Sequence, residues 1–155
     1  MARKHQSALL QGEQLVADGA EQRLVRAAGQ VLAEMKTAGD NDLGIVIGSE
    51  SLLHRLNLKY RKVDSATDVL SFPSGEVDPD TSHLYLGDIV ISLPRAEAQA
   101  IAEGHPLADE LVLLVVHGTL HLLGYDHEQE NDKEPMQVAQ DAILKQLNLV
   151  VSTRL

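Results

Sequence analysis

The sequence has no cysteine and no tryptophan, and aromatic residues make up only 3% of it. Without cysteine, the chain can have no disulfide framework, no thiolate zinc finger and no cysteine nucleophile. The few aromatic residues are also scattered along the chain, which argues against an aromatic platform on which the bases of a single-stranded nucleic acid would stack. Any such strand would have to be held by charge and shape.

Long apolar runs are absent as well. The longest, residues 111–116, has six residues, whereas a helix that crosses a bilayer needs about 20. The apolar pair Leu9-Leu10 near the N-terminus is too short for the core of a signal peptide. We therefore expect a cytoplasmic protein that does not contact a membrane.

The sequence also lacks a surplus of positive charge. It has 13 Lys and Arg residues against 23 Asp and Glu residues, which gives a formal net charge of −10. This excludes proteins that coat nucleic acid through their bulk charge, because such binding needs a positive face that displaces counterions. It leaves open a local basic groove.

No internal repeat, low-complexity tract or long Pro/Gly linker divides the chain. With 155 residues, of which 44% are hydrophobic, the sequence has the length and composition of one soluble globular domain. Splitting it would leave each half with a thin hydrophobic core. We therefore treat residues 1–155 as a single domain.

Apolar periodicity and turn residues predict an α+β fold, in which helices pack on one mixed sheet of about four strands. Pro73 is expected to stop the second strand, and Pro135 is expected to delay the start of the last helix. The loop at residues 74–82 leaves room for a hairpin. The elements that we place are helices at residues 20–35, 50–60, 95–103, 106–123 and 138–147, and strands at residues 43–47, 67–72 and 84–91.

Three histidines fall within eleven positions at the end of the long apolar helix. His117 and His121 are four residues apart, so their rings project from one helical face, and a turn at Gly124 would bring His127 back toward them. A single histidine on an apolar helix is usually a core residue, but three at this spacing are hard to bury without partners. The pattern predicts three nitrogen ligands for a zinc ion and one open position, as in catalytic zinc sites.

The spacing is that of the metzincin peptidase signature H-E-x-x-H-x-x-G-x-x-H, except that Gly118 replaces the general-base Glu. Glycine inside a helix costs about 1 kcal/mol relative to alanine, which suggests close approach to the backbone beside the metal. We interpret the glycine as leaving room for the substrate. On that view, Gly118→Glu would block the substrate, keep the zinc and slightly strengthen the helix.

Three segments together resemble the YbeY family of bacterial endoribonucleases, which act on single-stranded RNA in ribosomal RNA maturation. They are His117-Gly-Thr-Leu-His-Leu-Leu-Gly-Tyr-Asp-His127, Leu56-Asn-Leu-Lys-Tyr-Arg-Lys-Val-Asp-Ser-Ala-Thr-Asp-Val-Leu-Ser-Phe-Pro73 and Leu86-Gly-Asp-Ile-Val-Ile91. In order and spacing the resemblance covers residues 43–147. It departs from the family pattern after the histidine signature, where this chain reads Glu134-Pro-Met136-Gln.

Four of the 13 basic residues lie between Arg55 and Lys62, in an otherwise acidic chain. They could contact phosphates beside the metal, or they could simply favour the negative end of a helix dipole. For Arg61 alone, the resemblance implies a catalytic role as a phosphate clamp. For Asp68 and Asp88 we favour structural roles at a strand start and a bulge over orienting a ligand histidine.

The resemblance implies a zinc-dependent endoribonuclease that holds one Zn²⁺ per chain and acts in ribosomal RNA maturation and ribosome quality control. Its implied partners are single-stranded RNA of the small ribosomal subunit and ribosomal proteins. Two nucleophiles are compatible with the sequence: a water activated at the metal and the RNA 2′-hydroxyl.

Two other functions remain as alternatives. A ribosome-assembly factor without catalysis, in which the metal is structural, suits the net charge of −10. A zincin-like peptidase shares the histidine spacing, but the missing Glu counts against it.

Overall fold

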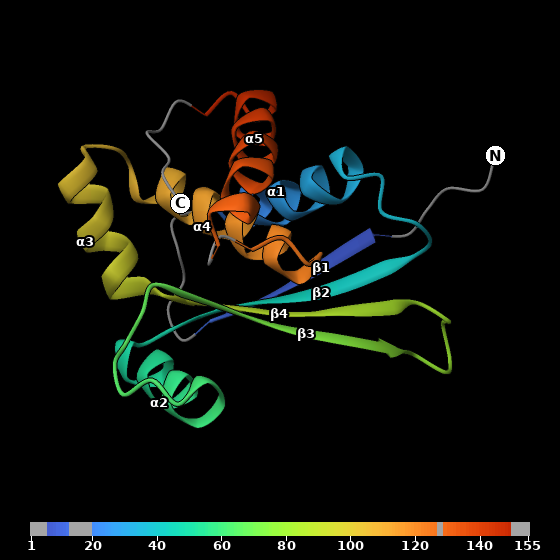
Figure 1. Ribbon diagram of the computed structural model, residues 1–155, viewed down its shortest axis with the longest axis horizontal. Helices are drawn as coiled ribbons and strands as arrows, with labels where there is room; N and C mark the ends of the chain where they lie inside the picture. Colours follow the sequence, from blue (N-terminus) through green and yellow to red (C-terminus); the bar gives the residue numbers. More distant parts are fainter. Residues whose placement is uncertain (1–5, 13–19, 127–128, 150–155) are drawn as a thin grey trace.

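The computed structural model describes residues 6–12, 20–126 and 129–149. Figure 1 shows a twisted sheet with α1, α4 and α5 over one face and α2 below the other. The elements in chain order are β1 (Gln6–Gly12), α1 (Ala20–Glu34), β2 (Asn41–Gly48), α2 (Glu50–Arg61), β3 (Val69–Val77), β4 (Leu84–Ser92), α3 (Leu93–Glu103), α4 (Leu107–Leu122) and α5 (Glu130–Gln146).

The sheet is mixed, with the strand order β1-β2-β4-β3. β2 pairs in parallel with both β1 and β4, whereas β3 and β4 form an antiparallel hairpin. The α+β class, the mixed sheet and the hairpin are confirmed. Within the described residues β3 is an edge strand, so the side chains near it can be approached from outside the sheet.

Alternate residues of β4 feed two separate cores, as the two-residue period of a strand requires. Ile89 and Ile91 are buried in the larger core, together with apolar residues of α1, α4 and α5. Val90 lies between them in sequence and packs instead with Leu53 of α2 and Leu70 of β3. The sheet thus separates the α4 side of the molecule from the α2 side.

About four strands were expected from the sequence, and three of them were located. These three correspond to β2, β3 and β4. The N-terminal strand β1 was not located from the sequence. Its backbone pairs with β2 from Gln6 opposite Asn41 to Gly12 opposite Ile47. Hydrogen bonds along the backbone of a neighbouring strand leave no trace in hydrophobic periodicity, which is the signal that located the others.

The expectation that Pro73 stops the second strand is wrong. β3 continues to Val77, with Pro73 opposite Gly87 and a register irregularity between Pro73 and Glu76. Proline lacks a backbone N–H but is tolerated in an edge strand, where that group would face outward. Residues 74–77, which we expected in a loop, therefore belong to the hairpin.

The last helix also starts earlier than expected. α5 begins at Glu130 and contains Pro135, so the proline lies inside the helix and does not delay it. The buried Met136 immediately follows this proline and belongs to the larger core. Burial of the α5 face outweighs the single backbone hydrogen bond that proline removes. None of the described helices is long and apolar enough to span a membrane.

Candidate metal centre and active site

α4 has a buried apolar face and a partly buried face that carries the two histidines. Leu111, Val115 and Gly118 are buried on the side that packs into the larger core. His117 and His121 are partly buried and lie one turn apart. Their Nε2 atoms are 3.1 Å from each other, and their rings cross at 74°.

The spacing of the two nitrogens suits a shared metal ion. Two ligands on a tetrahedral zinc, each with a bond of about 2.0–2.1 Å, are about 3.3 Å apart. The Nε2–Nε2 distance between His117 and His121 is 3.1 Å, close to this value. The donor set therefore fits zinc as far as these two residues go.

Gln140 of α5 holds His117 from behind. Its Oε1 lies 3.0 Å from Nδ1 of His117, and the residue is only 2% exposed. Because a carbonyl oxygen can only accept, this bond places the ring proton on Nδ1 and leaves the Nε2 lone pair toward His121. Gln140 was not predicted from the sequence. A polar residue within the buried α5 stripe of Met136, Gln140 and Ile143 is the signal that could have found it.

The third predicted ligand, His127, lies outside the described residues, so its position relative to the pair remains a prediction. Gly124 has a φ of +98° just after α4, which provides the turn that the sequence predicts. Within residues 20–126 and 129–149, no group of three His, Asp or Glu side chains could hold a metal ion.

Gly118 is explained by the sheet beneath it. A Cβ at this position would lie 2.7 Å from Cγ2 of Ile89 and 3.2 Å from Oγ of Ser71. The Ser71 hydroxyl also donates a 3.0 Å hydrogen bond to the Gly118 carbonyl. The expected close approach is therefore made by β3 and β4, and the interpretation that the glycine leaves room for substrate is wrong. A glutamate here would not strengthen the helix, because its Cβ would already clash with Ile89.

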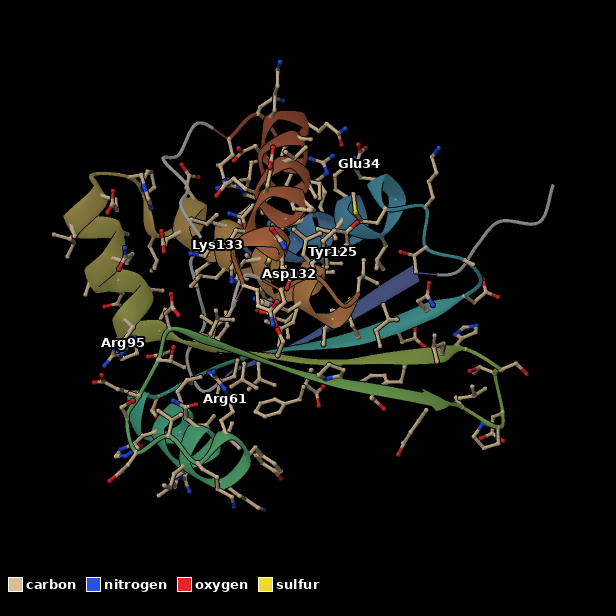
Figure 2. The ribbon with its side chains drawn as sticks, in the orientation of Figure 1. Glu34, Arg61, Arg95, Tyr125, Asp132 and Lys133 are labelled. Carbon is tan, nitrogen blue, oxygen red and sulfur yellow. The ribbon has the colours of Figure 1, made fainter. Side chains whose placement is uncertain are left out.

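A cleft of about 450 Å³ joins the two sides of the sheet. It is lined by His117 and His121 of α4, and also by Arg61 at the end of α2. Figure 2 shows Arg61 on the α2 side of the strands and Tyr125 among the helices on the other side. The other lining residues come mainly from β3 and the turn after α4: Thr67, Asp68, Val69, Leu70, Ser71, Pro73, Gly124, Tyr125 and Asp126.

The basic end of α2 is exposed and locally ordered. Ser49 caps the start of the helix by accepting from the Leu52 N–H, and Lys62 ends it in a left-handed conformation with a φ of 63°. Nζ of Lys62 lies 3.3 Å from the Lys59 carbonyl, so Lys62 serves the helix end. Among the described residues, no carboxylate forms an ion pair with Arg61.

The two aspartates differ in their relation to the cleft. Asp68 accepts from the Val69 N–H at 2.9 Å, as the strand-start interpretation predicts, but it also lines the cleft. Asp88 accepts from the Tyr85 hydroxyl and does not line the cleft. Burial, and then this bond to a carboxylate, raise the pKa of Tyr85.

A second cleft of about 480 Å³ adjoins the first, and both are lined by Asp68, Val69 and His117. It is acidic, because Glu103 and Glu110 also line it. Glu110 is only 3% exposed and lies 2.6 Å from Nε2 of His105. Burial raises the pKa of Glu110, and the bond to His105 opposes this shift.

Comparisons with known proteins identify the same family as the three sequence segments do. A family model described as "Endoribonuclease YbeY" matches residues 9–148. The chain is 42% identical to the endoribonuclease YbeY of Pelotomaculum thermopropionicum over 143 residues, covering 90% of this chain and 94% of that one. It is 46% identical to the same enzyme of Roseiflexus castenholzii over 129 residues, covering 80% and 81%.

The fold also matches a solved structure. The solution structure of the protein TM1509 from Thermotoga maritima aligns over 91% of both chains, with a TM-score of 0.57 and 26% sequence identity. The family match and the relatives each span most of the sequence, including the histidine pair and the end of α2. The chain therefore belongs to the YbeY endoribonuclease family.

Proposed function

We propose that this protein is a zinc-dependent endoribonuclease that cuts single-stranded RNA in the cytoplasm. Its relatives bear the name endoribonuclease, which supports phosphodiester cleavage of RNA as the reaction. Its target is the RNA of the small ribosomal subunit during maturation and quality control, where ribosomal proteins accompany it.

His117, His121 and His127 would hold one zinc ion per chain. When bound, the ion would supply Lewis-acid chemistry to a phosphate in the cleft. Gln140 keeps the Nε2 lone pair of His117 available, because its Oε1 accepts a 3.0 Å hydrogen bond from Nδ1–H on the opposite side of the ring. Arg61 binds the phosphate from the other side of the cleft and offsets the charge that develops on it.

The observation that carries the proposal is the composition of the cleft. It combines two converging imidazoles, whose Nε2 atoms are 3.1 Å apart, with an arginine that no described carboxylate neutralises. Such a site suits an anionic substrate that is attacked next to a metal. A peptidase is disfavoured because Gly118 is packed against Ile89, so the general-base position has no space for a carboxylate side chain.

The test measures metal content and cleavage on the same preparation. Purified protein should contain about one zinc per chain and cut a labelled single-stranded RNA, but neither the matching duplex nor a casein-type peptide. His117→Ala should lose both zinc and cleavage. An assembly factor with a structural metal would instead bind zinc and ribosomal particles without cutting RNA, and peptide cleavage alone would indicate a zincin.

A further inference from the structure

We infer that the exposed end of α2 is a second RNA-contacting site, in which Tyr60 stacks on an unpaired base next to the scissile phosphate. This site, which we call the α2 platform, consists of Arg55, Lys59 and Tyr60. The inference rests on the proposed function and specifies how a single strand reaches the cleft. The sequence alone predicted no aromatic platform, because its few aromatic residues are far apart along the chain.

The fold brings two of these aromatic residues together. Tyr60 of α2 and Phe72 of β3 pack edge to face, with ring centroids 5.3 Å apart and planes at 66°. Tyr60 nevertheless remains 57% exposed. Phe72 therefore contacts the tyrosine ring while more than half of the Tyr60 residue stays exposed. A large aromatic ring held in place at the surface can stack a base with little loss of side-chain entropy.

Positive charge lies beside the exposed ring. Nζ of Lys59 lies 5.0 Å from the Tyr60 ring centroid, and Arg55 is exposed one helical turn before Lys59. Among the described residues, neither Arg55 nor Lys59 pairs with a carboxylate, whereas Arg23 pairs with Asp109. In a chain with a net charge of −10, unneutralised cations beside an exposed aromatic ring suit an anionic ligand with stacking groups.

The platform is continuous with the cleft across an edge strand. Arg61, Ser71 and Pro73 line the cleft. Tyr60 immediately precedes Arg61, and Phe72 lies between Ser71 and Pro73. Because β3 is the edge strand of the described sheet, an RNA strand can pass around it from the platform to the histidines. The second cleft, which also borders His117, is lined by Glu103, whose negative charge would disfavour a phosphate there.

This path also gives a reason for selecting single strands. A base can stack on a protein ring only when it is not already enclosed in a duplex. A paired substrate would present its phosphates to Arg55 and Lys59 but could not engage Tyr60. Stacking on Tyr60 therefore adds affinity for single strands alone, whereas Arg55 and Lys59 could contact the phosphates of either form.

The experiment measures binding of a labelled 2′-O-methyl oligoadenylate to the zinc-loaded protein by fluorescence anisotropy, with a gel to show that the oligonucleotide stays intact. Tyr60→Leu should weaken binding by about fivefold or more, while Tyr60→Phe should not. Lys59→Ala should reduce the slope of log affinity against log salt by about 0.7. The control is Lys145→Ala, which removes an exposed lysine on α5. It should change neither quantity.

An oligonucleotide with abasic positions provides the decisive arm. Wild-type protein should bind it more weakly than oligoadenylate, and Tyr60→Leu should add no further loss. If folded Tyr60→Leu binds oligoadenylate like wild type, the inference is overturned, while RNA cleavage by the wild type would leave the proposed function standing. Should Tyr60→Leu fail to fold, an unchanged salt slope in Lys59→Ala overturns the inference instead.

Discussion

The two sides of the cleft are built in opposite ways. On α4, the histidine pair sits above a packed interface, with Gly118 against Ile89 and Gln140 behind His117. On α2, Arg61 is exposed, and its helix is held mainly by its own caps and a small cluster of buried residues. Metal ligands must be fixed within a fraction of an ångström, whereas a phosphate contact tolerates an adaptable cation.

Because of this difference, substitutions on the two sides of the cleft should affect different properties of the protein. Substitutions under the histidines should disturb packing and metal binding first, because those residues are supported by buried neighbours. Substitutions at the end of α2 should disturb RNA binding and cleavage while the fold persists, because an exposed guanidinium contributes little to stability.

The largest effect should come from Gly118→Glu, which places a side chain where Ile89 and Ser71 already lie. Overpacking and burial of a charge without a partner should cost at least about 3 kcal/mol of folding free energy. We expect a variant that unfolds at a much lower temperature and loses cleavage along with its fold, measured by circular dichroism.

Two alanine variants sharpen this result. Gly118→Ala should destabilise by about 1–3 kcal/mol because its Cβ would still lie 2.7 Å from Ile89. Gly29→Ala, in the middle of α1 with no neighbour within 4 Å, should stabilise by about 0.5–1 kcal/mol. Equal effects at the two glycines would refute the packing explanation.

On the other side of the cleft, Arg61→Ala should reduce RNA cleavage by about 100-fold, the usual range for a group that stabilises transition-state charge. Zinc content should stay at the wild-type level, and unfolding free energy should change by less than about 1 kcal/mol. Cleavage of labelled RNA, elemental analysis and thermal unfolding measure the three quantities. Loss of metal or of fold would instead make Arg61 structural.

A smaller effect is expected for Gln140→Leu, which keeps the volume behind His117 but removes its acceptor. Without this bond, the Nδ1 proton loses its partner, and zinc affinity should fall by about 10-fold. Competition with a chelator measures the affinity. In the metal-free protein, ¹⁵N chemical shifts of His117 should show a larger share of the tautomer protonated on Nε2. Unchanged affinity and tautomer would show that other contacts orient the ring.

The sequence predicted the elements whose burial follows a clear period. α1, β2, β4 and α3 lie close to the predicted ranges because their apolar residues recur regularly and glycine or proline marks their ends. β1, the continuation of β3 past Pro73 and the early start of α5 were not predictable in this way. They depend on pairing with a neighbouring strand or on packing against the core, which local sequence does not encode.

The candidate site divides similarly. The histidine spacing predicted the convergence of His117 and His121, because two residues four positions apart on a helix lie on the same face. Gln140 and the contact between Tyr60 and Phe72 join elements that are distant in sequence, and only the fold brings them together. Gly118 shows the reverse case, in which a correct signal of close approach was assigned to substrate although the neighbour is the sheet.

The smallest effect concerns Glu110 at the start of α4, whose pKa is raised by burial. A carboxyl group with a raised pKa in the folded state favours folding while it is protonated, and this contribution is lost as pH rises from about 4.5 through the folded-state pKa. His105, Asp68 and Glu103 act on the same carboxyl group. Glu110→Gln keeps an acceptor for His105 but cannot ionise.

The stability of wild type relative to Glu110→Gln should therefore decline as pH rises across this window, measured as the difference between the two melting temperatures. Glu97→Gln, at an exposed position on α3 that does not line this cleft, is the matched control and should show no comparable trend. A difference for Glu110→Gln that stays flat with pH would mean that the pair with His105 stabilises the ionised carboxylate enough to cancel the effect of burial. The buried side of α4 would then tolerate a charge. Burial alone would no longer explain why substitutions on α4 and at the exposed end of α2 differ in their effect on stability.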